Sequence, residues 1–332
     1  MHEFSVLTGK DVAELLDGRE AEVIGWVREA YLAHDARDTV NPDSCFLRFP
    51  DKPDSRIIAL PAYLGGTRQV AGIKWIGSFP ANVADGLPRA SAVLVLNDYR
   101  TGHPFALLEA AGISAARTAA SAALAATALG ATRPASVGVI GAGVIARTIC
   151  HYLTAAGVPL ADVTVHDHDD TSAAALTGHL TRTYGAPSRT GDLRSALDCD
   201  LVVLATTALR PYIGAGHTLR PGQVVLNVSL RDLTPELLLT AQNVVDDIEH
   251  CLKADTSPHL AEQRTGNRSF IAGTLADVLL GRCAPDPGRA IVFSPFGLGV
   301  LDLTVGHHLY QRAGEEGRLL PVPGFFGDTS RW

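Results

Sequence analysis

The sequence lacks most features that mark secreted, metal-binding or membrane proteins. Its five cysteines include no Cys-x-x-Cys pair, so their spacing indicates neither a disulfide framework nor a zinc site. We expect reduced, mostly buried thiols. The opening letters, M-H-E-F-S-V-L, contain neither the basic nor the apolar segment of a signal peptide. The longest apolar run, residues 118–132, is alanine-rich and too short to span a bilayer, and we therefore expect a cytoplasmic protein that does not bind membranes.

Lysine is also scarce. Only four of the 28 basic residues are lysine, and the net charge is -7. Basic residues do not alternate with aromatic ones, which argues against a nucleic-acid partner and favours a small molecule. Residues 166–170 read His-Asp-His-Asp-Asp, but consecutive side chains at a strand end point in divergent directions. We predict no metal site there.

A glycine turn is the most informative feature that is present. Residues 136–146 read S-V-G-V-I-G-A-G-V-I-A, an apolar strand that runs into a turn and a helix start. Gly141 allows the sharp turn, Gly143 allows a pyrophosphate to approach the backbone, and Ala146 allows close packing of helix and strand. The pattern predicts a dinucleotide-binding turn, whose helix N-terminus attracts phosphate.

The identity of the dinucleotide is indicated by the next strand. That strand ends at Asp167, at roughly the 20-residue spacing of the dinucleotide fingerprint. A carboxylate there accepts a hydrogen bond from the ribose 2′-hydroxyl and repels a 2′-phosphate, and no arginine directly follows it. We predict that the cofactor is NAD.

The organisation of the chain follows from alternating strand and helix patterns. With 332 residues and 46% hydrophobic content, the chain has the length of about two domains. Alternation of strands and helices predicts a mostly parallel sheet covered on both faces. Its expected strands are residues 137–140, 163–166, a weakly marked one near 188, 201–205, 224–228 and 244–245. The expected helices of this region end near residue 156 and span 171–184.

The preceding region has a different pattern. A helix is expected over residues 9–33, followed by short strands at 56–60, 72–76 and 92–96 and a turn at 97–102 that predicts a hairpin. Residues 291–294 read as a strand and 299–313 as an amphipathic helix that returns to the first domain. We predict an α/β protein with a doubly wound Rossmann sheet at 116–299, and an α+β substrate-binding and dimerisation domain at 1–115 with 300–332.

Three residues are candidates for chemistry. Lys74 lies inside an apolar strand and must either reach solvent or meet an anion. Arg117 is the only charge between Glu109 and Arg133; it is either structural or holds a pyrophosphate or carboxylate. Asp232 lies just beyond the fifth strand, where open α/β sheets bind ligands, although it could instead help to start the next helix.

Several short sequence motifs, spread over nearly the whole chain, together resemble those of the ornithine cyclodeaminase and mu-crystallin family. They are D-S-R-I-I-A-L-P-A-Y-L-G-G, G-I-K-W-I-G-S around Lys74, R-A-S-A-V-L-V-L-N-D, A-R-T-A-A at Arg117, G-A-G-V-I-A and N-V-S-L-R-D ending at Asp232. The chain departs from true cyclodeaminases around Lys74 and at residues 229–233. A family arginine usually found two residues after a proline is also replaced, because Pro42 is followed by Asp43 and Ser44.

The resemblance implies an NAD-dependent enzyme that acts on a CH–NH group and dimerises through its non-coenzyme domain. The finer likeness implies oxidative hydrolysis of N-(2-amino-2-carboxyethyl)-L-glutamate to L-2,3-diaminopropionate and 2-oxoglutarate, within siderophore or peptide-antibiotic biosynthesis. A pathway synthase is implied by analogy only. The alternatives are an ornithine cyclodeaminase, or an imine reductase or ligand-binding protein similar to mu-crystallin.

Expected site residues follow from the motifs and the resemblance. Lys74 and Asp232 are the expected catalytic pair, with Asp232 as the base. Substrate carboxylates are expected on Arg48, Arg56, Lys74, Arg89 and Arg117. The coenzyme is expected on Arg117, Thr118, Gly141, Gly143, Val144, Ile145, Asp167, Thr206, Thr207 and Ser229.

Overall fold

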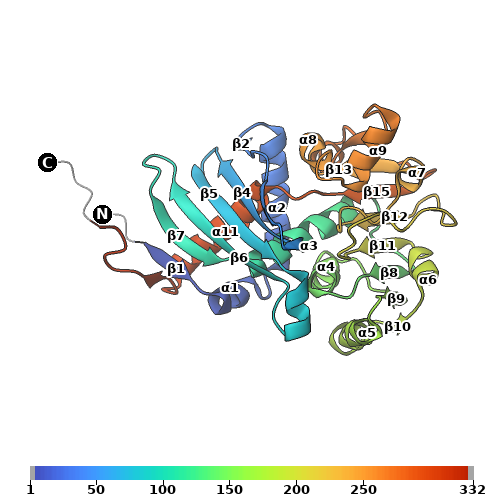
Figure 1. The fold of residues 1–332 in the computed structure, drawn as a ribbon, viewed down its shortest axis with the longest axis horizontal. Helices are drawn as coiled ribbons and strands as arrows, with labels where there is room; N and C mark the ends of the chain where they lie inside the picture. Colours follow the sequence, from blue (N-terminus) through green and yellow to red (C-terminus); the bar gives the residue numbers. More distant parts are fainter. Residues whose placement is uncertain (1–3, 328–332) are drawn as a thin grey trace. The chain divides into compact units, whose positions relative to one another are not determined.

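The structure is a computed structural model that describes residues 4–327, and it divides into two compact units. Unit 1 consists of Met1–Arg117 together with Leu298–Trp332, and unit 2 of Thr118–Gly297. Unit 1 is therefore built from two segments of the chain, whereas unit 2 is continuous. Figure 1 shows the strands and helices of each unit.

Unit 2 contains a sheet of eight parallel strands. In spatial order they are β10 (Ser188–Thr190), β9 (Val163–His166), β8 (Val137–Ile140), β11 (Leu201–Leu204), β12 (Val224–Asn227), β15 (Ile291–Ser294), β13 (Gln242–Val245) and β14 (Ile271–Thr274). The order reverses direction between β8 and β11, which is the switch point where doubly wound sheets bind ligands. The predicted Rossmann sheet is confirmed.

The helices of unit 2 connect successive strands. They are α4 (Val144–Ala155), α5 (Asp170–Tyr184), α6 (Leu193–Leu197), α7 (Pro235–Leu238), α8 (Ile248–Cys251), α9 (Ser257–Thr265) and α10 (Leu275–Leu279), while α3 (Ala111–Ala128) crosses the boundary between the units. Strands β8, β11, β12 and β15 are buried along their whole length. This burial explains their continuous apolar sequence.

Unit 1 contains a mostly antiparallel sheet. Its main path is β16 (Leu320–Pro321), β1 (Ser5–Leu7), β7 (Pro104–Glu109), β6 (Ala90–Asp98), β5 (Val70–Ser78), β4 (Lys52–Leu64) and β2 (Thr39–Val40), and β3 (Cys45–Phe49) pairs with β4. The hairpin predicted around residues 97–102 joins β6 to β7. One pairing differs from the expected antiparallel pattern, because β1 runs parallel to β7.

The helices of unit 1 correct one prediction. The single helix expected over residues 9–33 is two helices, α1 (Gly9–Leu16) and α2 (Glu20–Asp35). The chain leaves α1 at Asp17, and Gly18 has a φ of 71°, a conformation that ends a helix and that glycine adopts without steric cost. A short 3-10 helix spans Pro80–Asp85, and the predicted C-terminal helix is α11 (Gly299–Glu315), which packs across β4, β5 and β6.

The two faces of the unit 1 sheet differ in character. Successive strand residues point to opposite faces, so Lys74 and Ser78 of β5 share the face on which α11 packs. Trp75 points to the opposite, outer face and is 43% exposed. Its cross-strand neighbours are Ala59 and Val93. The outer face is therefore apolar at its centre.

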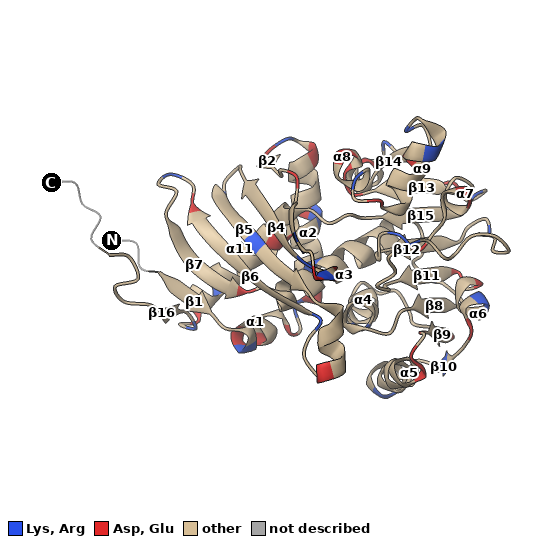
Figure 2. Ribbon diagram, viewed as in Figure 1, with Lys and Arg blue, Asp and Glu red and all other residues tan. Residues whose placement is uncertain are grey.

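Charged residues are spread over both units, with acidic and basic positions interspersed (Figure 2). Among residues 4–327, none of the helices combines the length and the apolar character that a membrane crossing requires.

Candidate active site

The turn after β8 has the geometry that a dinucleotide requires. Gly141 has a φ of 90°, and a Cβ atom there would lie 2.5 Å from the carbonyl oxygen of Ala205. Gly143, at the N-cap of α4, is exposed, and a Cβ atom there would meet no protein atom within 4 Å. Ala146 is fully buried. The turn thus requires glycine at 141, while the space beside Gly143 and the N-terminus of α4 suit a pyrophosphate.

The acid at the end of β9 lies beside this turn. One oxygen of Asp167 accepts a hydrogen bond from the backbone N–H of Ala142 at 2.6 Å, and the other accepts from Asp169 N–H at 2.9 Å. This contact ties the end of β9 to the glycine turn. Other predicted coenzyme residues follow the carboxyl ends of β8, β11 and β12, on the same edge of the sheet: Val144, Ile145, Thr206, Thr207 and Ser229.

Asp232 lies at the same edge, and its carboxylate is held by two hydroxyls. Its side chain is fully buried. Thr206 Oγ1 donates to Asp232 Oδ1 at 2.6 Å, and Ser229 Oγ donates to Oδ2. Its carboxylate does not cap the following helix, whose N-cap is Thr234. The structural alternative, in which Asp232 starts that helix, is therefore wrong.

The surroundings of Asp232 make its carboxylate a stronger base than that of an ordinary aspartate. Burial raises the pKa of the Asp232 carboxyl, while the hydrogen bonds from Ser229 and Thr206 oppose that rise. The backbone beside it is strained, because Leu230 has a φ of 74°. Such a conformation costs a non-glycine residue about 1–2 kcal/mol, and strain of this kind is often found at functional sites.

Unit 1 contains the second cluster of predicted site residues. Lys74 Nζ lies 2.7 Å from Asp302 Oδ2 and donates to Ser114 Oγ at 3.0 Å. Arg117 Nε donates to the other oxygen, Asp302 Oδ1, at 3.1 Å. The Lys74 side chain is 2% exposed and that of Asp302 is fully buried. The lysine inside an apolar strand therefore meets an anion, one of the two expected possibilities.

Three predicted arginines gather at one end of the same sheet face. Arg56 pairs with Ser78 across β4 and β5, and Arg48 pairs with Arg56 across β3 and β4. Arg89 Nη1 donates to Ser78 Oγ at 2.9 Å. Ser78 lies four residues beyond Lys74 along β5, about 13 Å from it at the usual rise of a strand. The face thus has two cationic regions, one at Lys74 and one at Ser78.

The structure thus brings the predicted residues together in two groups, one in each unit. Lys74, Arg117 and the Ser78 region belong to unit 1, and Asp232 and the glycine turn belong to unit 2. Sequence reasoning missed Asp302 and Ser114. Asp302 is the only charged residue in the apolar first half of α11, residues 299–306. A carboxylate in such an apolar stretch indicates a buried ion pair, and this pattern could have identified Asp302 from the sequence.

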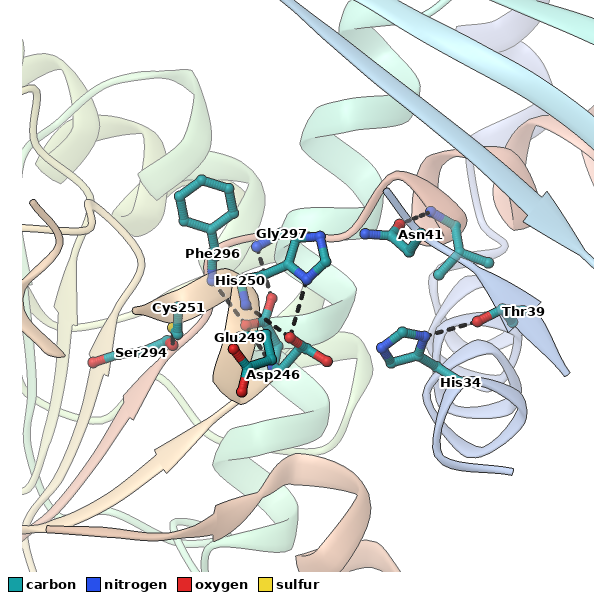
Figure 3. Close-up of polar contacts among 12 residues, drawn as sticks. His34, Thr39, Asn41, Asp246, Glu249, His250, Cys251, Ser294, Phe296 and Gly297 are labelled. Atoms are coloured by element: carbon teal, nitrogen blue, oxygen red, sulfur yellow. Dashed lines mark hydrogen bonds and ion pairs between the residues drawn. The ribbon is translucent and has the colours of Figure 1, made fainter. Parts of the chain in front are cut away.

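A further buried carboxylate organises the edge of the unit 2 sheet (Figure 3). Asp246 follows β13 and is 2% exposed. Its oxygens accept hydrogen bonds from the backbone N–H groups of Asp247 and Phe296 at 2.9 Å each and of Gly297 at 2.7 Å. Beside it, Cys251 Sγ donates to the Ser294 carbonyl at 2.7 Å. These contacts fix the chain where it leaves β15.

The described residues hold neither a cluster of metal ligands nor a disulfide. Between residues 4 and 327, no group of three or more His, Cys, Asp or Glu side chains is arranged to hold a metal ion. All five cysteines are free: Cys150, Cys199 and Cys251 are buried, Cys283 is half-buried and Cys45 is exposed. Most of the thiols are therefore shielded from solvent, as expected.

The parallel sheet, its glycine turn and the acid beyond β9 define a Rossmann-type dinucleotide-binding protein. The chain belongs to the ornithine cyclodeaminase/mu-crystallin family, whose sequence profile matches residues 4–317. The predicted family is therefore confirmed.

Relatives with similar sequences and folds are amino-acid dehydrogenases and reductases. N-((2S)-2-amino-2-carboxyethyl)-L-glutamate dehydrogenase of Staphylococcus aureus is 27% identical over 95% of this chain and 96% of its own length. The Thermococcus litoralis Δ(1)-pyrroline-2-carboxylate reductase, solved with NADH and L-proline, is 25% identical with a TM-score of 0.88, over 96% of this chain and 99% of its own. An archaeal alanine dehydrogenase dimer with bound NAD shares the fold, with 24% identity, a TM-score of 0.87 and coverage of 97% and 100%.

Proposed function

We propose that this protein is an NAD-dependent enzyme that oxidises and hydrolyses N-(2-amino-2-carboxyethyl)-L-glutamate to L-2,3-diaminopropionate and 2-oxoglutarate. The observation that carries this proposal is the pair of cationic regions on one sheet face, at Lys74 and at Ser78. A substrate with several carboxylates needs more than one such region. The Staphylococcus aureus relative, matched along almost the whole of both chains, acts on this substrate by its name.

Carboxylate recognition is assigned to unit 1. Lys74 and Arg117 share the single negative charge of Asp302, so this cluster has a net charge of +1 and attracts one carboxylate. Arg89 with Ser78, and Arg56 beside them, provide donors for another. Arginine is suited to this role because its planar fork matches a carboxylate.

The residues of unit 2 support hydride removal. NAD, which the turn at Gly141 and Gly143 would hold, would supply the acceptor for a hydride from the glutamate-side α-carbon. The nitrogen lone pair drives departure of that hydride, so the secondary amine must first lose its proton to a base. Asp232 takes that proton in our proposal. The resulting C=N bond adds water, and the carbinolamine then breaks its C–N bond to release 2-oxoglutarate and the primary amine.

A second candidate is reduction or oxidation of a cyclic imino acid. The fold shared with a pyrroline-2-carboxylate reductase favours it. That substrate has one carboxylate, which the Lys74 and Arg117 cluster would hold, and it leaves Arg56 and Arg89 without a role. Release of ammonia and proline from ornithine would instead indicate the cyclodeaminase reaction.

The test is a direct assay of the purified protein. We expect incubation with NAD and N-(2-amino-2-carboxyethyl)-L-glutamate to produce NADH and 2-oxoglutarate in equal amounts, with a strong preference for NAD over NADP because of Asp167. The matched substrate control is N-(2-aminoethyl)-L-glutamate, which lacks one carboxylate. Turnover of pyrroline-2-carboxylate with NADH, and none of the larger substrate, would contradict the proposal.

We also propose that the protein is a homodimer joined through the outer face of the unit 1 sheet. This face presents Trp75, Leu47 and other apolar side chains, and Trp75 and Leu47 are 43% and 47% exposed. An apolar patch of this kind is typical of an interaction surface. The related alanine dehydrogenase is a dimer.

The Trp75→Glu variant tests this surface. We expect it to weaken dimerisation by about 100-fold, because it replaces a buried aromatic contact with a charge that must be desolvated. Light scattering after size exclusion, over a dilution series, measures the mass. The control is Leu280→Glu, which alters an exposed leucine of unit 2. An unchanged mass for Trp75→Glu at low concentration would place the interface elsewhere.

A further inference from the structure

Asp302 is a buried carboxylate with two cationic partners. It belongs to α11 and its side chain has no exposed surface. One of its oxygens lies 2.7 Å from Lys74 Nζ and the other 3.1 Å from Arg117 Nε. Breaking a buried ion pair by removing one partner leaves an uncompensated charge, so the state of each cation depends on this carboxylate.

The surroundings of Lys74 offer few other polar groups. On its own sheet, its direct neighbours are Leu60 of β4 and Leu94 of β6. The polar groups that face it come from two helices, Asp302 on α11 and Ser114 with Arg117 on α3. Ser114 is neutral, so Asp302 is the one negative charge that the described residues place against this ammonium group.

The charges act on Lys74 in opposite directions. The pKa of Lys74 is lowered from 10.5 to about 8: burial, the largest cause, and the charge of Arg117 lower it, whereas Asp302 raises it. Loss of the carboxylate would therefore leave only influences that favour the neutral amine. A neutral Lys74 would not attract a substrate carboxylate.

Asp302 also constrains how Arg117 can bind. The carboxylate engages the guanidinium at Nε. Within residues 4–327, the two terminal nitrogens of Arg117 have neither a hydrogen bond nor an ion pair. A guanidinium held at Nε keeps its terminal nitrogens available to an anionic ligand.

We propose that Asp302 is a positioning residue that keeps Lys74 protonated and holds Arg117 by its Nε atom, so that both cations bind one substrate carboxylate. This proposal rests on the proposed function at one point, namely that the carboxylate bound by the two cations belongs to the substrate. The dependence of Lys74 on Asp302 can be measured without any substrate.

The scarcity of lysine makes that measurement direct. The chain has four lysines, so protein grown with lysine labelled at Cε with carbon-13 gives few NMR signals, and Lys74 is assigned from its loss in Lys74→Met. In the wild type we expect Lys74 to titrate near pH 8. In Asp302→Asn, which keeps the shape of the side chain, we expect the midpoint to fall by about one to three pH units.

Two further variants complete the test. Ser114→Ala removes the neutral partner of Lys74 and should move the midpoint much less than Asp302→Asn does. Asp302→Glu retains the charge and should restore a midpoint above that of the Asn variant. An unchanged midpoint in Asp302→Asn overturns the proposal. If that variant does not fold, a wild-type midpoint below neutral pH overturns the proposal, and a midpoint near pH 8 that Asp302→Glu preserves supports it.

The kinetic readout separates this proposal from the assigned reaction. With the substrate that the enzyme turns over, we expect KM in the wild type to rise above pH 8 as Lys74 loses its proton. In Asp302→Asn the rise should begin at a lower pH, and KM at neutral pH should increase about tenfold or more, with a smaller change in kcat. A fall in kcat alone, with KM and its pH profile unchanged, would contradict a binding role. Failure of the aminocarboxyethyl-glutamate assay leaves the NMR result intact.

Discussion

Replacing Asp232 with asparagine is expected to lower turnover by about 10²- to 10⁴-fold, the range associated with loss of a general base. Asparagine has the same size. Its carbonyl oxygen can accept from one of the two hydroxyls of Thr206 and Ser229, and its amide group can donate to the other, so the fold and the affinity for NAD should change little. The formation of NADH gives the rate, and calorimetric titration gives the affinity for the coenzyme.

The matched control is Asp198→Asn. Asp198 is an exposed residue at the end of α6, just before β11 begins, and thus lies at the amino edge of the sheet, opposite the edge that binds ligands. This variant should turn over at the wild-type rate. An Asp232→Asn enzyme within tenfold of wild type would mean that another group removes the proton.

The pH profile offers a finer test of the same residue. Because burial raises the pKa of Asp232, kcat/KM should fall on acidification at a higher pH than an ordinary aspartate would give. Ser229→Ala removes a hydrogen bond that lowers this pKa. In that variant kcat/KM should therefore begin to fall at a still higher pH than in the wild type. A fall that begins at a lower pH would contradict the assignment of Asp232 as the base.

Replacing Asp246 with alanine is expected to destabilise the protein by about 3 kcal/mol or more. Its carboxylate accepts three backbone N–H groups, and each buried donor left without a partner costs about 1–3 kcal/mol. In a unit of this size the melting temperature should fall by about 10 °C. Differential scanning calorimetry of the coenzyme-free protein measures the change.

Two variants bracket this effect. Asp246→Asn retains one side-chain acceptor and should lose less stability than the alanine variant. Asp255→Ala removes an exposed aspartate from the same unit, and it should leave the melting temperature within about 2 °C of wild type. Equal melting temperatures for Asp246→Ala and wild type would show that water replaces the carboxylate.

The parts of the fold that were predictable from the sequence are those with local signals. Strands β8 and β9 have the predicted bounds because both are short apolar runs that end at turn residues. The division of the first helix at Asp17 and Gly18 was missed because its apolar pattern resumes after the break. The insertion of β15 between β12 and β13 depends on pairing across the chain, which no local pattern reveals.

The same distinction applies to the candidate site. The glycine turn and Asp167 form a fingerprint of fixed spacing, which the sequence displays directly. Asp302 is 228 residues from Lys74, and only the packing of α11 against β5 brings the two together. Similarly, the gathering of Arg56 and Arg89 at Ser78 depends on strand register.

The discontinuity of unit 1 has a consequence for biosynthesis. Lys74 and Arg117 are translated before unit 2, and Asp302 is translated after it. Unit 2 is a continuous segment and can fold while the ribosome is still at work, because domains generally fold as units as they emerge. The nascent sheet of unit 1 must wait for α11, with its buried lysine lacking a counter-charge until the last tenth of the chain leaves the ribosome.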